Sequence, residues 1–164
     1  YDAYLTPRST CWGWASWRDR WEKIDWAVSD YEAFTKNNNL QQAFNQGGED
    51  LTHLLKLQMT KKINSWAIRM DYARFKRGCV GINPVRSYTT NIGMDSGTHT
   101  MITDTRFDND ISHAIANPRW PDHIFVDEAI ARAYRTACAP PNPALPVRAI
   151  NKLWRTLFSR NLFR

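Results

Sequence analysis

The sequence lacks any long apolar run. Its 164 residues include no stretch near the roughly 18 apolar residues that a membrane-spanning helix needs. No charged start followed by an apolar centre marks a signal peptide. We therefore expect a chain that is soluble or peripheral to a membrane, and its length suits one domain with a single hydrophobic core.

Cysteine is scarce. The three cysteines, Cys11, Cys79 and Cys138, lie far apart and none has a Cys-x-x-Cys partner. The odd number and wide spacing argue against a disulfide framework and against a zinc site. Reduced thiols in a cytoplasmic protein are the simplest interpretation, with each cysteine acting as a small buried or half-buried residue.

Acidic residues are absent after Glu128, whereas seven Lys and Arg residues follow it. The formal net charge of +6 therefore comes from the C-terminal part, and residues 1–128 are close to neutral. A nucleic-acid-binding domain should carry its positive charge over a folded face, often interleaved with aromatic residues. The distribution argues against nucleic acid as a partner of residues 1–128 and leaves only the tail as a weak candidate.

The sequence does contain a polar, glycine-rich stretch at residues 91–100, NIGMDSGTHT. Gly93 and Gly97 allow the backbone to turn sharply and to approach a ligand closely. Asp95 and His99 are separated by three small residues, so both can face one polar ligand or one divalent metal ion. The alternative is an ordinary loop with a hydrogen-bonded histidine.

Tryptophan is concentrated near the N-terminus. Trp17, Trp21 and Ile24 recur at helical spacing, which predicts an amphipathic helix from residue 16 to about residue 25 with an aromatic core face. Trp12 and Trp14 precede it. For these two, a core cluster and a platform that stacks on sugar rings or nucleobases are equally open, because an exposed indole suits both.

Four further helices are predicted from capping residues and apolar spacing. Their expected extents are a short helix opened by the capping box at residues 29–32 and ending in 37–39, then 49–61, 66–77 capped by Ser65 and stopped by Gly78, and 127–137. Glu49 and Asp50 suit the positive end of a helix dipole, with a catalytic pair as the alternative.

Arg69 follows Trp66 by three residues, so the two side chains lie beside each other on the predicted helix. A guanidinium next to an indole at a helix start suits an anionic group such as a diphosphate, since it binds paired oxygens in a fork. The alternative is a surface ion pair close to Asp71.

Two strands are expected, one near residues 1–6 and one over 79–85 that Pro84 interrupts. The second leads into the loop at 91–100, and this order of helix, strand and glycine loop indicates an α/β fold. Because strand-like alternation begins at the first residue, we expect the chain to be part of a longer fold.

The sequence divides into three regions: a domain over residues 1–138, a stiff proline-rich linker over 139–146, and a basic amphipathic helix over 147–164. Such a helix suits docking on an anionic membrane surface, as at the inner face of a cell membrane. Packing on its own domain or on a second subunit is an equal alternative. The apolar stripe is Val147, Ile150, Leu153, Trp154, Leu157, Phe158 and Leu162.

Three blocks give the chain a resemblance to the C-terminal half of bacterial GT-A glycosyltransferases, the family-2-like sugar transferases of polysaccharide assembly. Residues 12–17 (WGWASW) resemble the family's WGWATW, residues 64–69 (NSWAIR) its NSWAIRW, and residues 91–99 its NIGxDGSGTH. They occur in the same order as in the family. Two positions depart from the family's pattern: Met70 stands where the family often has Trp, and Ser96 replaces a Gly of the loop.

The resemblance implies a helix-rich C-terminal portion of a Rossmann-like GT-A fold. In the family, an N-terminal half binds the nucleotide-sugar and carries an acidic element that holds a divalent metal, Mn or Mg, on the diphosphate. That half is missing here, so the resemblance implies a fragment or one part of a split enzyme, inactive alone. Related members have an Asp near the position of Ala67, so no general base can be transferred there.

The implied reaction moves a sugar from a nucleotide-diphosphate donor to a hydroxyl of a saccharide or lipid-linked acceptor. We expect Asp95 as the general base, with Asp71 as the second candidate. We expect His99 to bind a metal ion that the missing half also binds. The expected substrate-binding residues are Trp12, Trp14, Trp66, Arg69, Asn91, Gly93, Ser96 and Gly97. The alternative is a non-catalytic carbohydrate-binding module that uses the tryptophans as platforms.

Overall fold

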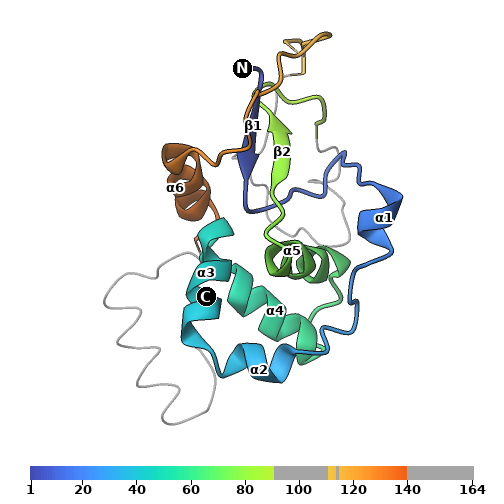
Figure 1. The fold of residues 1–164 in the computed structure, drawn as a ribbon, viewed down its shortest axis with the longest axis vertical. Helices are drawn as coiled ribbons and strands as arrows, with labels where there is room; N and C mark the ends of the chain where they lie inside the picture. Colours follow the sequence, from blue (N-terminus) through green and yellow to red (C-terminus); the bar gives the residue numbers. More distant parts are fainter. Residues whose placement is uncertain (91–110, 114, 140–164) are drawn as a thin grey trace.

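A computed structural model of the chain describes residues 1–90, 111–113 and 115–139. This part is a mixed, mostly helical unit with six α-helices, one 3-10 turn and a two-stranded sheet (Figure 1). In chain order the elements are β1 (Ala3–Thr6), α1 (Arg18–Trp21), α2 (Tyr31–Thr35), α3 (Asn38–Phe44), η1 (Asn45–Gly47), α4 (Leu51–Met59), α5 (Trp66–Lys76), β2 (Gly81–Pro84) and α6 (Glu128–Ala137).

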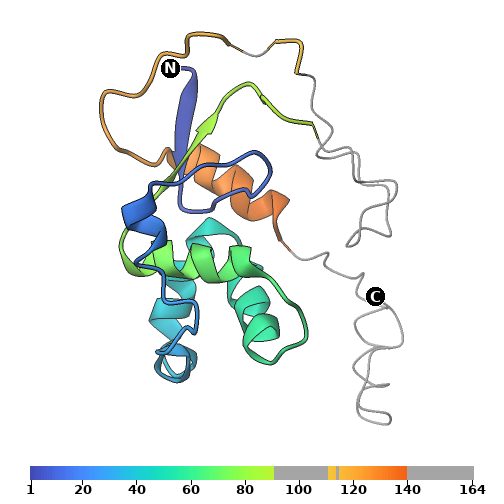
Figure 2. The ribbon, with the colours of Figure 1, turned by 90° about the vertical axis from the view of Figure 1, so that its right-hand side faces the viewer.

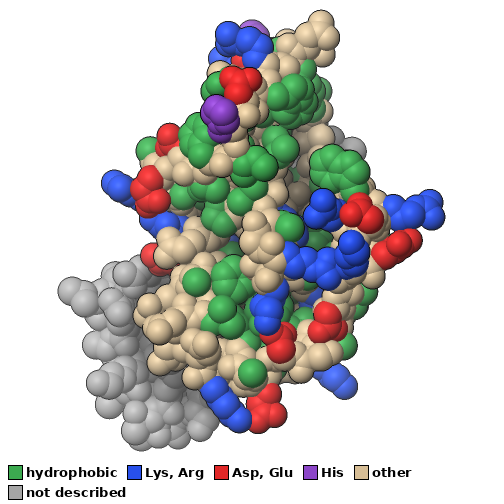
Figure 3. All heavy atoms as spheres, viewed as in Figure 1, with side chains coloured by type: hydrophobic (Ala, Val, Ile, Leu, Met, Phe, Trp, Pro, Cys, Tyr) green, Lys and Arg blue, Asp and Glu red, His purple; other side chains and the backbone are tan. Residues whose placement is uncertain are grey.

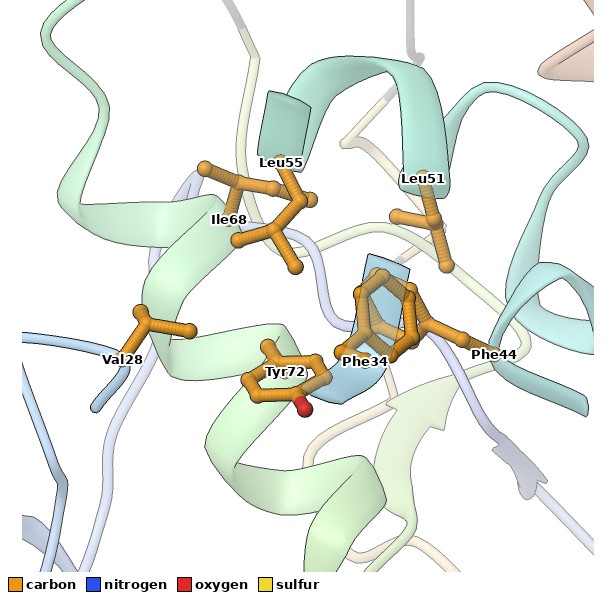
Figure 4. Close-up of a cluster of buried hydrophobic side chains, with 7 residues drawn as sticks. All are labelled: Val28, Phe34, Phe44, Leu51, Leu55, Ile68 and Tyr72. Carbon is orange, nitrogen blue, oxygen red and sulfur yellow. The ribbon is translucent and has the colours of Figure 1, made fainter. Parts of the chain in front are cut away.

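The core lies among helices α2 to α5. Seven buried side chains form it (Figure 4): Val28, Phe34, Phe44, Leu51, Leu55, Ile68 and Tyr72. The rings of Phe34 and Tyr72 meet edge to face with centroids 4.9 Å apart, an arrangement that aromatic quadrupoles favour. Leu54 and Met59 pack against this cluster, so α4 turns an apolar face toward the core, as the apolar spacing of residues 49–61 predicts.

Two predicted helix starts and one predicted stop are confirmed. The Ser65 hydroxyl accepts a hydrogen bond from the backbone N–H of Ile68 at the start of α5, and the Asp127 carboxylate accepts from the N–H groups of Ala129 and Ile130 at the start of α6. Each bond satisfies a backbone donor that the helix leaves without a partner. Gly78 follows α5 with a φ of +62°, a conformation that glycine adopts readily.

The region of residues 29–44 differs from the prediction. The helix predicted from the capping box is α2; its N-cap residue is Asp30 rather than Ser29, no side chain caps its first turn, and it ends at Thr35. The Asn37 side chain then accepts from the N–H of Leu40 and opens α3, a helix that the sequence did not predict. The asparagine run therefore starts a helix instead of only ending one, because asparagine is a favoured N-cap residue.

The sheet brings the N-terminal strand against a strand that follows α5. β1 and β2 are antiparallel, with Ala3 opposite Pro84 and Thr6 opposite Gly81. Figures 1 and 2 show the sheet at one end of the helical unit with α6 beside it. The hydroxyls of Tyr4 on β1 and Tyr134 on α6 lie 3.3 Å apart, and Arg135 of α6 donates a hydrogen bond to Gln46 of η1.

The expected α/β architecture is therefore found only in part, as a combination of helices and strands. Both predicted strands exist, but they pair with each other antiparallel, and the described residues contain no parallel Rossmann-like sheet. The reason is that α1 to α5 follow one another with no strand between them, whereas a parallel sheet needs alternating strands and helices.

The predicted helix at residues 16–25 is much shorter than expected. Only α1 forms, its N-cap residue Trp17 makes no capping hydrogen bond, and none of its residues is buried. Trp17 is 73% exposed and Trp21 38% exposed, so the prediction that these two tryptophans belong to the core is wrong. The glycine loop at 91–100 and the tail at 147–164 lie outside the described residues, as does all but Ala139 of the linker at 139–146.

Candidate functional site

Four tryptophans from separate parts of the chain meet on the surface, and we call them the tryptophan platform: Trp14, Trp21, Trp26 and Trp66. Trp14 precedes α1, Trp21 ends it, and Trp66 begins α5. The ring centroid of Trp14 lies 5.6 Å from that of Trp21 and 5.0 Å from that of Trp66. These three residues are between 37% and 39% exposed, so the indoles pack on one another and still face solvent.

Arg69 supports one end of the platform. Its Nη1 donates to the backbone carbonyl of Trp26 at 3.2 Å, and its Nε donates to that of Ser65 at 3.4 Å. Its guanidinium carbon lies 5.7 Å from the centre of the Trp26 ring, within the range of a cation–π contact. Among the described residues Arg69 makes no ion pair, so the alternative of a surface ion pair is not found.

Two open hollows lie along the platform and share Trp21. The first has a volume of about 500 Å³ and is lined by Trp14, Ala15, Ser16, Arg18, Trp21 and Glu22. The second has a volume of about 410 Å³ and is lined by Trp21, Trp26, Trp66 and Arg69. On the face drawn in Figure 3, Lys and Arg side chains gather over α5 and beside α1, with acidic side chains among them.

The chain that leads to the glycine loop packs on the same region. Gly13 has a φ of +61°, and a β-carbon there would lie 2.3 Å from Cγ2 of Thr89. Only glycine fits this contact without a shift. Thr89 lies between β2 and residue 91. The segment that follows β2 therefore packs against the turn at residues 12–14.

Asp71 lies in a different set of contacts. It is 5% exposed, and its Oδ1 accepts hydrogen bonds from the backbone N–H and hydroxyl of Ser9 and from Nη1 of Arg74. Burial raises the pKa of the Asp71 carboxyl above its usual value. These bonds join the segment after β1 to α5, and none of the three residues lines either hollow.

The structure thus brings together some of the predicted site residues. Trp14, Trp66 and Arg69 meet in the platform, whereas Asp71 does not line it. Trp12 is exposed next to Gly13. The remaining candidates lie outside the described residues: Asn91, Gly93, Asp95, Ser96, Gly97 and His99.

A metal site is not seen in the part of the chain that the structure describes. No group of three or more His, Cys, Asp or Glu side chains lies close enough there to hold an ion. The predicted ligand His99 is outside this part, so the expected manganese or magnesium stays a prediction. In the same ranges, no helix is long and apolar enough to cross a bilayer.

Six residues that line the hollows are not among the site residues that the sequence predicts: Ala15, Ser16, Arg18, Trp21, Glu22 and Trp26. For Trp21 the helical spacing predicts a place in the core instead. The available signal was the density of charged residues around Trp21, since residues 18–20 and 22–23 are all charged. A helix so surrounded has no wide apolar face to bury.

Comparisons of the chain with protein-family models, with curated proteins and with solved structures find no match.

Proposed function

We propose that the chain is the acceptor-side part of a glycosyltransferase that transfers a sugar from a nucleotide-diphosphate donor to a saccharide or lipid-linked hydroxyl in polysaccharide synthesis. In this proposal it forms the helix-rich C-terminal portion of a GT-A fold. The observation that carries the proposal is the meeting of Trp14 and Trp66. These residues belong to two of the three blocks that resemble the family.

The segment that precedes the third block lies close to the same place, because Thr89 packs against Gly13. Residues 12–17 and 64–69 are far apart in the sequence, so local structure does not account for their contact. A shared substrate site would account for it. The exposure of three packed indoles also supports a binding surface, since large exposed apolar patches commonly mark one.

Sugar transfer needs positive charge at the departing diphosphate and a base for the attacking hydroxyl. We assign the first task to Arg69, which still has N–H groups beyond the two used for backbone carbonyls. Asp95 remains the first candidate for the base, because the Oδ1 of Asp71 already accepts three hydrogen bonds. The described residues offer no metal cluster, so no step of the proposal relies on the ion.

The test is transfer by the protein that carries this chain, together with whatever sequence precedes Tyr1. Labelled UDP-, GDP- and dTDP-sugars are incubated with saccharide and lipid-linked acceptors and with manganese or magnesium. We expect label in the acceptor, and Trp14→Ala should lower kcat/KM for the acceptor by about tenfold or more. Trp120→Ala removes an exposed indole outside the platform and should leave kcat/KM unchanged.

A second candidate function follows from the exposed and mutually packed indoles of the platform. This candidate is a non-catalytic carbohydrate-binding module. Saccharide binding that Trp14→Ala abolishes, with neither transfer nor hydrolysis of any nucleotide-sugar, would reject the enzyme and favour the module.

A further inference from the structure

The two hollows of the platform differ in their polar groups. The first presents the Arg18 guanidinium, the Glu22 carboxylate and the Ser16 hydroxyl beside Trp14 and Trp21. The second presents only the Arg69 guanidinium among three indoles. The first hollow therefore offers both hydrogen-bond donors and a charged acceptor, whereas the second offers side-chain N–H donors and no carboxylate.

Arg18 and Glu22 are available to a ligand. They lie one helical turn apart at the two ends of α1, where Arg–Glu pairs commonly bond to each other. No ion pair joins them, and neither makes a side-chain hydrogen bond to any other described residue. Both are exposed at the rim of the first hollow, so each can bond to a ligand without losing a protein partner.

We propose that the platform binds at least two consecutive rings of a neutral oligosaccharide, one ring in each hollow with Trp21 between them. In this arrangement Glu22 is a specificity-determining residue. It accepts hydrogen bonds from sugar hydroxyls, and its negative charge offsets the attraction that Arg18 would otherwise exert on a sugar carboxylate in the first hollow. The inference rests on the proposed function, of which it names the acceptor class, and it applies equally to a binding module.

The shape and charge of the platform favour this occupant. Each volume lies within the range of roughly 300–1,000 Å³ that small-molecule sites occupy. Most of the residues that line the hollows are exposed, as binding of a chain across a surface requires. A hydroxyl-bearing ring both donates and accepts, which matches the Arg18 and Glu22 pair. A nucleotide would stack on the same indoles, yet a phosphate in the first hollow would face the Glu22 carboxylate as well as the Arg18 guanidinium.

The experiment measures the affinity of the full chain for oligosaccharides by calorimetry. The probes are mono- to hexasaccharides of glucose, galactose and mannose in both anomeric linkages, and the matching uronic-acid oligomers. We expect affinity to rise by about tenfold or more between one ring and two or three, and then to level off. Saturation-transfer NMR should show the strongest contacts at the C–H protons of the sugar rings.

Variants separate the platform from the rest of the surface. Trp14→Ala should lose binding, whereas Trp14→Phe, which keeps an aromatic ring and the packing, should keep part of it. Glu22→Gln removes the charge and should narrow the preference for neutral over uronic oligomers. The matched controls are Trp120→Ala, and Glu32→Gln on α2, where the carboxylate pairs with Lys36. Thermal unfolding of each variant verifies its fold.

Affinity that does not change with chain length would overturn the inference, as would an equal effect of Trp120→Ala or no binding of any probe. Length-dependent binding without sugar transfer would support oligosaccharide binding at the platform and reject the glycosyltransferase. Sugar transfer with an acceptor KM that Trp14→Ala and Glu22→Gln leave unchanged would support the glycosyltransferase and reject binding at the platform.

Discussion

Gly13 and Thr89 are in contact: a β-carbon at Gly13 would lie 2.3 Å from the Thr89 methyl carbon. The backbone of Gly13 also has a φ of +61°, which side-chain-bearing residues rarely adopt. This contact joins the turn that presents Trp14 to the segment that leads into the glycine loop. The relative position of these two parts of the proposed site therefore depends on the absence of a single methyl group.

The first prediction tests this contact. Gly13→Ala should lower the free energy of unfolding by about 1–3 kcal/mol more than Gly78→Ala, because it adds overpacking to backbone strain. Gly78 is a matched control, since its φ is +62° but a β-carbon there would meet no atom within 4 Å. Urea unfolding measures both variants. Adding Thr89→Ser removes the obstructing methyl group and should restore part of the loss; equal destabilisation by the two alanines would rule out the contact.

The second prediction concerns Arg8 and Asp50, which tie the end of β1 to the start of α4. Two guanidinium nitrogens donate to the two carboxylate oxygens at 2.6 and 3.0 Å, and both side chains are only 17% exposed. Asp50 thus has a specific partner, beyond the dipole role expected from its place at a helix start. Asp50→Asn should lower the free energy of unfolding by about 1–3 kcal/mol, between the values for exposed and buried pairs.

The control for this variant is Lys36→Ala, which breaks an exposed pair with Glu32 one helical turn away. That change should lower the free energy of unfolding by only about 0.3–0.5 kcal/mol. If both variants unfold at the same urea concentration, the Arg8–Asp50 pair contributes no more than a surface pair.

The third prediction is a pH dependence. Partial burial alone would raise the pKa of the Asp30 carboxyl. Hydrogen bonds from Lys76 and Tyr72 outweigh this effect and hold that pKa below its ordinary value of 3.8. A lowered folded-state pKa stabilises the fold above the ordinary value, and this stabilisation is lost as the pH falls through the folded-state pKa. Below about pH 4, melting temperature should therefore fall less steeply in Asp30→Asn than in the wild type.

Asp19→Asn is the comparison for that experiment, because Asp19 pairs with Arg20 on the exposed surface. Its curve should follow the wild type. Some acid sensitivity should persist in every variant, since hydrogen bonds also lower the pKa of Asp2 and Asp25. An unchanged slope in Asp30→Asn would show that the Asp30 contacts do not contribute to acid stability.

The fourth prediction concerns the basic tail, which lies outside the described residues. Deleting residues 147–164 should abolish sedimentation with anionic phospholipid vesicles, because each basic residue near such a surface contributes about 1 kcal/mol. Neutral vesicles are the control for charge. If the shortened protein instead keeps its binding and loses thermal stability, the tail packs on its own domain.

The sequence predicted best where local chemistry and packing agree. α5 and α6 each combine a side chain that caps the first turn with a face that packs on the rest of the molecule. α3 was missed because three consecutive asparagines are typical of a loop, although the first of them is a good N-cap. Local patterns of this kind show where a helix can begin, but they do not decide between two roles of the same residue.

The platform was only partly predictable. The spacing of Trp17 and Trp21 is the same for a buried and an exposed helix face, and what covers a face depends on distant parts of the chain. The contact between Trp14 and Trp66 joins such distant parts, and no periodicity indicates it. Only the resemblance of the two blocks to one family placed both residues at a common site.

The pairing of β1 with β2 also has a consequence for the order of folding. Adjacent helices from α2 to α5 contact one another, and the contact of Phe34 on α2 with Tyr72 on α5 spans a shorter stretch of chain than the loop of residues 7–80 that the two strands must close. Loop closure has an entropic cost that non-local contacts repay only once they form. We therefore expect the amides of the helical core to become protected before those of the strands in pulse-labelled hydrogen exchange. The contact of Thr89 with Gly13 would then form late, because Thr89 follows β2 in the chain. Simultaneous protection of strands and helices would contradict this order.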